Sequence, residues 1–256
     1  MNFKFGKLPP KHNSKTLKLS KYLKSATLLP APPAKSYWEY KSIPAKGWNM
    51  LANDSVGDCT AACVGHMIMM WLAHGGILIT PTDAEILAFY SAVTGYNPAD
   101  PSTDQGAAIT DVLAKLQSDG ITIGGKVHKI LAWAQIDQTN QVEVEQANYI
   151  FGGLDIGFNV PQSALDQNQA GQSWDVVAND GGIVGGHSVP IFGYGSHGAT
   201  CVTWGALQQM SWAFFKAYCD EVYVVITQDW LNQAGSLTPS GFDLAALTAD
   251  LAAMKQ

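Results

Sequence analysis

Residues 53–72 read NDSVGDCTAACVGHMIMMWL, and no other stretch constrains the fold as strongly. From Cys59 to Leu72 the side chains are apolar on almost every side of a helical wheel, which indicates a helix buried in the core. Asp58, directly before this run, is a residue type that caps helix N-termini, and Gly75-Gly76 follows where the helix should end. We therefore predict a buried helix that begins at Cys59.

The position of Cys59 at the start of this helix favours a role as a nucleophile. Free backbone N–H groups and the positive end of the helix dipole lie there and stabilise a thiolate. The same N–H groups can stabilise an oxyanion, and Asn53, six residues earlier, carries an amide that can donate a second hydrogen bond. The alternative for Cys59 is a buried structural thiol, which is the common state of a single cysteine.

A second block, GGHSVPIFGYG at residues 185–195, places His187 at the start of an apolar strand and after two glycines. Glycines let another group approach closely, and an imidazole titrates near neutral pH, so His187 is a candidate general base. Thr203, followed by Trp204 and Gly205, comes next at a strand-like spacing and is a candidate for orienting the imidazole.

Together these blocks resemble the papain-like cysteine peptidases. That family has an oxyanion-hole Gln six residues before a Cys at a helix start, a His-Ala-Val strand that ends in Gly-Tyr, and then Asn-Ser-Trp-Gly. The run DCTAAC at residues 58–63 is also similar to the Asp-Cys-Gly-x-Ala-Cys of bacteriocin-leader peptidases, which favours Cys59 over Cys63 as nucleophile. The resemblance spans residues 29–226, and the whole chain also resembles uncharacterised phage and bacterial proteins.

The resemblance implies a two-lobed α+β fold with the site in the cleft between the lobes. It also implies a cysteine peptidase or related thiol amide hydrolase that works through a Cys59–His187 dyad and an acyl-enzyme, with no metal or organic cofactor. The chain departs from the family at two positions. Asn53 replaces Gln, and Val202 stands where the family's orienting Asn belongs, so that Thr203, one position on, is the expected substitute.

The pattern of the remaining sequence agrees with a helical first half and a β-rich second half. We place a helical lobe at residues 37–151 and a β-rich lobe at 152–256, since the character of the sequence changes near Gly152. Periodicity predicts further helices at 83–93, 107–118 and 143–151, strands at 154–160, 188–194 and 221–226, and a C-terminal helix from Gly241.

Residues 1–36 form a Lys- and Pro-rich arm rather than a domain. Of the 15 basic residues, all lysines, eight lie between Lys4 and Lys35, so the arm carries about +8 and the remainder about −14. A basic arm on an acidic body is expected to dock on that body, and the family resemblance implies a pro-segment that crosses the cleft. Nucleic-acid binding is a poor fit, because arginine, the usual residue for phosphate contacts, is absent.

The composition excludes several other classes. Charges interrupt every apolar run near the N-terminus, so we expect no secretory signal, and no apolar run is long enough to span a membrane. The four cysteines are expected to be free thiols. The composition thus predicts a cytoplasmic or virion-associated protein without a secretory signal, and the resemblances imply the virion association and a peptide or protein substrate.

Two alternatives stay open at these residues. Cys59, Cys63 and His66 share one helix face and are candidate zinc ligands. The second alternative is a catalytically inactive papain-fold protein used for binding or assembly, for example with the proteins of a phage virion.

The pair Asp220-Glu221 is interpreted as solvated charge.

Overall fold

The computed structural model describes residues 3–11, 16–22, 31–38, 43–44, 47–228 and 230. The C-terminal helix expected from Gly241 lies outside these residues. The helices are α2 (Cys59–His74), α3 (Asp83–Thr94), α4 (Ile109–Ser118), α5 (Gln141–Phe151), α6 (Gln162–Gln169) and α7 (Trp212–Tyr218), with 3₁₀ helices η1 (Leu19–Tyr22) and η2 (Pro101–Thr103). The strands are β1 (Ser36–Tyr37), β2 (Ile121–Ile123), β3 (Lys126–His128), β4 (Ala132–Gln135), β5 (Leu154–Pro161), β6 (Ile183–Gly195), β7 (Gly198–Thr203), β8 (Ala206–Ser211) and β9 (Cys219–Ile226).

The predicted buried helix is confirmed as α2, which begins at Cys59 and ends before Gly75. Its residues from Cys59 to Ala73 are all buried, as expected for a helix without a polar face. Gly65 lies halfway along, where an added Cβ would come within 2.7 Å of Ile86, so its lack of a side chain lets α3 approach closely. No described helix has both the length and the apolar character that a membrane span requires.

Two further helices pack beside α2. A capping box between Thr82 and Glu85 starts α3, and the predicted third helix is α4, with its apolar face buried. We expected this helix from residue 107, but it begins at Ile109. Ala107 is held in an extended conformation instead, because its N–H donates to Gly6 O and its C=O accepts from Leu8 N.

A seven-stranded sheet forms the other half of the molecule, in the order β4-β9-β5-β6-β7-β8, and β1 pairs with β6 outside this path. The three predicted strands are confirmed as β5, β6 and β9. Strand β4 pairs with β9, and helix α5 packs against β6, so residues before Gly152 also contribute to the sheet half of the molecule.

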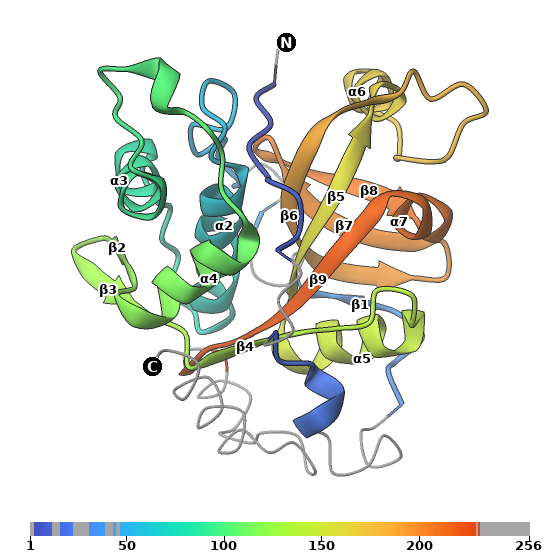
Figure 1. Ribbon diagram of the computed structural model, residues 1–256. Helices are drawn as coiled ribbons and strands as arrows, with labels where there is room; N and C mark the ends of the chain where they lie inside the picture. Colours follow the sequence, from blue (N-terminus) through green and yellow to red (C-terminus); the bar gives the residue numbers. More distant parts are fainter. Residues whose placement is uncertain are drawn as a thin grey trace.

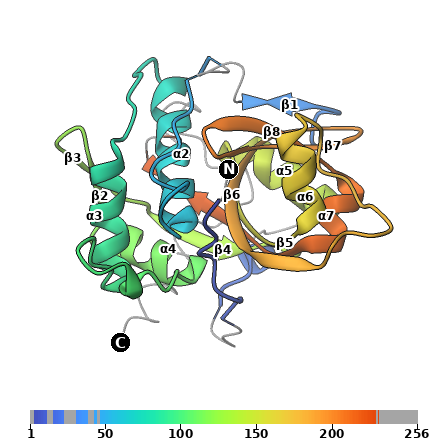
Figure 2. The same ribbon diagram turned by 90° about the horizontal axis from the view of Figure 1, so that it is seen from above.

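The N-terminal arm runs between the two halves. In Figure 1 the first segment of the arm, residues 3–11, descends from the N label between α2 and β6, and Figure 2, turned by 90°, places it between the same two elements. Main-chain hydrogen bonds connect it to both sides, from Leu8 N to Ala107 O at 3.0 Å and from Lys7 N to Gly186 O at 3.1 Å. The expectation that the arm docks on its own body is therefore confirmed for residues 3–11.

Candidate active site

Cys59 is the first residue of α2 and is 1% exposed. The preceding Asp58 starts the helix through its main chain, with its C=O accepting from Ala61 and Ala62, but its side chain makes no capping bond. Burial raises the pKa of the Cys59 thiol to about 11, although the backbone N–H groups of Ser188 and Gly6 favour the thiolate. With the arm docked, Cys59 is thus a protonated thiol.

His187 lies on β6, opposite Phe158 of β5. Its Nε2 is 2.7 Å from the Thr203 hydroxyl, whereas its Nδ1 has no hydrogen-bond partner among the described residues. The Trp204 indole stacks on the imidazole with centroids 4.9 Å apart. Burial lowers the His187 pKa to about 3, so the ring is neutral. When Nε2–H donates to Thr203, Nδ1 is the basic nitrogen.

All four predicted site residues line one cavity of about 10 Å³, namely Cys59, His187, Asn53 and Thr203. This volume is about what one water molecule needs. The site thus joins the start of α2 to strands β6 and β7, at the junction of the helical half with the sheet.

Asn53 lies at this cavity, but its amide is engaged locally. The Nδ2 group donates to Val56 O at 3.3 Å and to Asp58 Oδ1 at 3.2 Å. One of these bonds must open before the amide can bind an oxyanion. Val202, also at the cavity, is buried and presents only methyl groups.

The backbone on both sides of the site has an unusual conformation. Among the described non-glycine residues, Leu51, Ala52 and Trp204 have positive φ angles of 56°, 66° and 47°. Leu51 and Ala52 directly precede Asn53, and Trp204 directly follows Thr203. Such conformations are unfavourable for residues with a Cβ and concentrate at functional sites, where surrounding contacts maintain them.

The arm covers the site directly. The Phe5 ring lies edge-on to His187 with centroids 6.0 Å apart, and Phe3 stacks on Trp204 at 3.9 Å. Between them and the helix, the Gly6 N–H reaches the Cys59 sulfur. An added Cβ on Gly6 would lie 1.6 Å from Gly57 O, so only glycine fits here.

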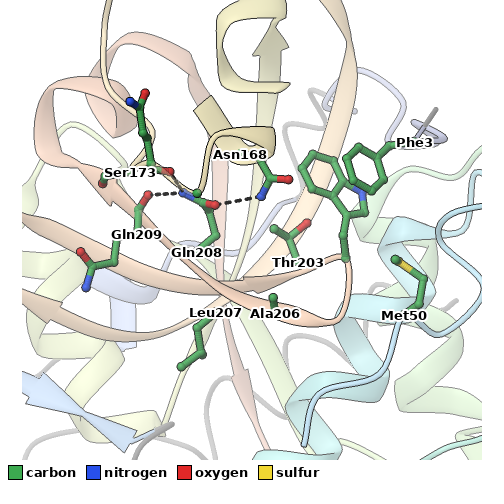
Figure 3. A pocket seen from close by; sticks show the side chains of 12 residues that line it. Phe3, Met50, Asn168, Ser173, Thr203, Ala206, Leu207, Gln208 and Gln209 are labelled. Carbon is green, nitrogen blue, oxygen red and sulfur yellow. Dashed lines mark hydrogen bonds between the residues drawn. The ribbon is translucent and has the colours of Figure 1, made fainter. Parts of the chain in front are cut away.

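A larger pocket of about 530 Å³ begins beside Trp204, with Phe3 at its edge (Figure 3). Its far wall carries uncharged carboxamides that hold one another in place. Asn168 Nδ2 donates to Gln208 Oε1, and Gln208 Nε2 donates to Gln209 O, each at 2.9 Å. A pocket lined by uncharged side chains therefore adjoins the site, with Thr203 and Trp204 lining both.

Sequence reasoning missed a buried acid near Cys59, namely Asp155. Asp155 on β5 accepts from the Ser188 hydroxyl at 2.9 Å and from the Cys63 thiol. Burial raises the pKa of Asp155 to about 7. The only signal in the sequence is a carboxylate near the start of a mainly apolar strand.

The interpretation of Asp220-Glu221 as solvated charge is wrong. Lys7 of the arm is buried, and its Nζ lies 2.9 Å from Asp220 Oδ1 and 3.0 Å from Glu221 Oε1. Glu221 is 1% exposed and accepts a further bond from the Tyr223 hydroxyl at 2.9 Å. The partner that buries these charges comes from more than 200 residues away in the chain, which local patterning cannot reveal.

The zinc interpretation finds no support in the described part of the chain. No group of three or more His, Cys, Asp or Glu residues there is arranged to hold a metal ion. Cys63 bonds Asp155 instead, and His66 Nε2 lies 2.8 Å from Asn49 O. Burial lowers the His66 pKa to about 4, as expected for a neutral core histidine.

No known protein family matches the sequence, and no curated protein is detectably similar to it. Solved structures are similar in fold. Xylellain, a cysteine protease from Xylella fastidiosa, superposes with a TM-score of 0.67 at 15% identity, covering 88% of this chain and 97% of its own. ProCathepsin B S9 from Trypanosoma congolense gives 0.61 at 12%, covering 88% and 87%. Procathepsin L 3 of the Tenebrio molitor larval midgut gives 0.54 at 10%, covering 88% and 76%.

Proposed function

We propose that this chain, which has the papain-like fold of these structural neighbours, is a cysteine peptidase or related thiol amide hydrolase. One observation carries the proposal. A cysteine at the start of a buried helix and a histidine oriented by a hydroxyl line the same small cavity, where two halves of the molecule meet. Nucleophile, base and orienting group are the parts that thiol catalysis needs.

The reaction follows from these positions. His187 Nδ1 takes the proton of the Cys59 thiol, and the thiolate attacks the carbonyl carbon of the substrate. The Cys59 backbone N–H and the Asn53 amide stabilise the oxyanion, once Asn53 exchanges one of its local bonds. His187 then gives its proton to the leaving amine as the C–N bond breaks, and water hydrolyses the thioester. Thr203 keeps the imidazole in the required tautomer.

The docked arm is a built-in inhibitor of this site. Its residue Lys7 pairs with Ala107 in a parallel bridge, while Gly6 and Phe5 cover the sulfur and the imidazole. Burial beneath the arm keeps both reacting groups neutral and excludes substrate. Displacing the arm rehydrates the pair, which raises the His187 pKa and lowers the Cys59 pKa towards the values that catalysis needs.

A second candidate is a papain-fold protein that binds or assembles, with phage virion proteins as partners, and does not catalyse. The filled cleft and the apolar Val202 beside the reacting groups favour it. In that case the arm is a permanent part of the core and the thiol never becomes reactive.

Labelling with iodoacetamide, mapped to each cysteine by mass spectrometry, separates the two. Gly6→Val displaces the arm, because the added side chain meets the Gly57 carbonyl. For an enzyme, Cys59 in Gly6→Val should label fast near neutral pH, and His187→Ala added to this variant should slow labelling by at least about tenfold. Labelling of Cys59 that stays slow in Gly6→Val, or that does not depend on His187, would refute the peptidase proposal.

A further inference from the structure

We infer that the pocket now filled by Lys7 selects the substrate, by binding a lysine or arginine side chain two residues before the cleaved amide. This inference rests on the proposed function and adds the class of peptide on which the site acts. The arm supplies the evidence, because it is a peptide already seated in the cleft.

The pocket binds a cation through two carboxylates. Lys7 Nζ lies 2.9 Å and 3.0 Å from the two oxygens of Asp220, and 3.0 Å from Glu221 Oε1. The side chain of Lys7 is 1% exposed. Among the described residues no other cation pairs with these two acids, so the arm provides their counter-ion.

The walls of the pocket match a long unbranched stem. An added Cβ on Gly157 would lie 2.1 Å from Lys7 Cε, and one on Gly186 would lie 2.3 Å from Lys7 O. Gly157 on β5 therefore leaves room for the stem of the lysine, and Gly186 on β6 leaves room for its main chain. A branched or aromatic side chain would meet the β5 backbone before it reached the carboxylates.

The carboxylates are held in place without the arm. Tyr223 donates its hydroxyl to Glu221 Oε2 at 2.9 Å, and the Asn159 amide donates to Asp220 Oδ2 at 3.3 Å. When the arm leaves, two preorganised acids face an empty pocket. Buried carboxylates without a partner are unfavourable, so a cationic side chain is the occupant that the pocket favours.

The position of the pocket along a substrate follows from the chemistry. The leaving amine must lie near the imidazole that protonates it, which is the side now covered by Phe5 and Phe3. Gly6, whose N–H acts on the Cys59 sulfur, separates Phe5 from Lys7, so Lys7 lies on the opposite, acyl side. The arm therefore runs in the direction opposite to that of a bound substrate. A substrate therefore places the second residue before its cleaved bond in the pocket.

Kinetics with the full-length Gly6→Val chain test this inference. The substrates are acetyl-X-glycyl-aminomethylcoumarins in which X is lysine, arginine, norleucine or phenylalanine; norleucine matches the lysine stem without its charge. We expect kcat/KM for lysine and arginine to exceed that for norleucine by at least about tenfold, as for a hydrogen-bonded charge. Asp220→Asn combined with Glu221→Gln should bring the ratio close to one. Cleavage that favours norleucine or phenylalanine would overturn the inference and leave the peptidase proposal intact.

A binding measurement covers the case in which no substrate is cleaved. The full-length Cys59→Ala, Gly6→Val chain is titrated calorimetrically with a peptide of residues 3–11, and with the same peptide carrying norleucine in place of Lys7. The lysine peptide should bind at least about tenfold more tightly, and the difference should vanish in the Asp220→Asn, Glu221→Gln variant. Equal affinity of the two peptides would refute the cation pocket, whatever the outcome for catalysis.

Discussion

Replacing Lys7 by methionine tests how the arm is held in the cleft. The substitution keeps most of the buried stem and removes the ammonium that lies 2.9 Å from Asp220 and 3.0 Å from Glu221. Two carboxylates then face each other without a counter-ion in the docked state, whereas the undocked state is almost unaffected. The docked arm is therefore destabilised relative to the released arm.

The size of the effect follows from the exposure of the pair. Removing one partner of a fully buried ion pair costs about 3–5 kcal/mol. The Asp220 side chain is 23% exposed, so solvent screens part of its charge, and Glu221 can take up a proton. We expect about 2 kcal/mol, which corresponds to roughly a thirtyfold rise in the population with the arm released.

The assay is the rate at which iodoacetamide labels Cys59 in the full-length chain. When the arm exchanges faster than labelling occurs, this rate follows the released population. Lys7→Met should therefore label roughly thirtyfold faster than the wild-type chain. The matched control is Lys4→Met, because Lys4 lies on the same arm and is exposed; it should label at the wild-type rate. If Lys7→Met labels no faster than Lys4→Met while Gly6→Val labels fast, the ion pair does not hold the arm.

Three further predictions concern the groups around the reacting pair. Thr203→Val in the Gly6→Val chain should lower kcat by about tenfold with KM little changed, and Thr203→Ser should restore kcat. A rise in KM with kcat unchanged would contradict an orienting role. In the wild-type chain, NMR should show a His187 ring that stays neutral down to about pH 4, since its pKa is about 3; in Gly6→Val it should titrate closer to 6.5. Asp155, with a pKa raised to about 7, holds a proton in the folded state that the unfolded chain loses above pH 4, so its contribution to stability falls as pH rises from 4 to 7. Asp155→Asn should remove this pH-dependent loss of stability. In urea titrations, the free energy of unfolding of the variant relative to that of the wild-type chain should therefore rise by roughly 3 kcal/mol between pH 4.5 and pH 7.5. If the variant keeps the pH dependence of the wild-type chain, Asp155 is not its source.

The residues proposed to react are each marked by their own local sequence. The helix from Cys59 to His74 is apolar on every side, so burial of the helix and the position of its first residue both follow from the pattern. His187 is marked in the same way by two glycines and an apolar strand. Thr203 follows at a spacing that lets the neighbouring strand β7 bring its hydroxyl within 2.7 Å of the imidazole.

The surroundings of these groups depend on contacts between distant parts of the chain. Lys7 and Asp220 are 213 residues apart, and an acidic dipeptide on a strand end is locally indistinguishable from solvated charge. Asn53 shows the same limit at short range, since only the folded loop reveals that Val56 and Asp58 already bind its amide. The candidate nucleophile, base and orienting hydroxyl can therefore be chosen from the sequence, because helix and strand periodicity are local properties. What covers these groups and which charges they face becomes visible in the folded chain alone, because pairing across the cleft leaves no trace in neighbouring residues.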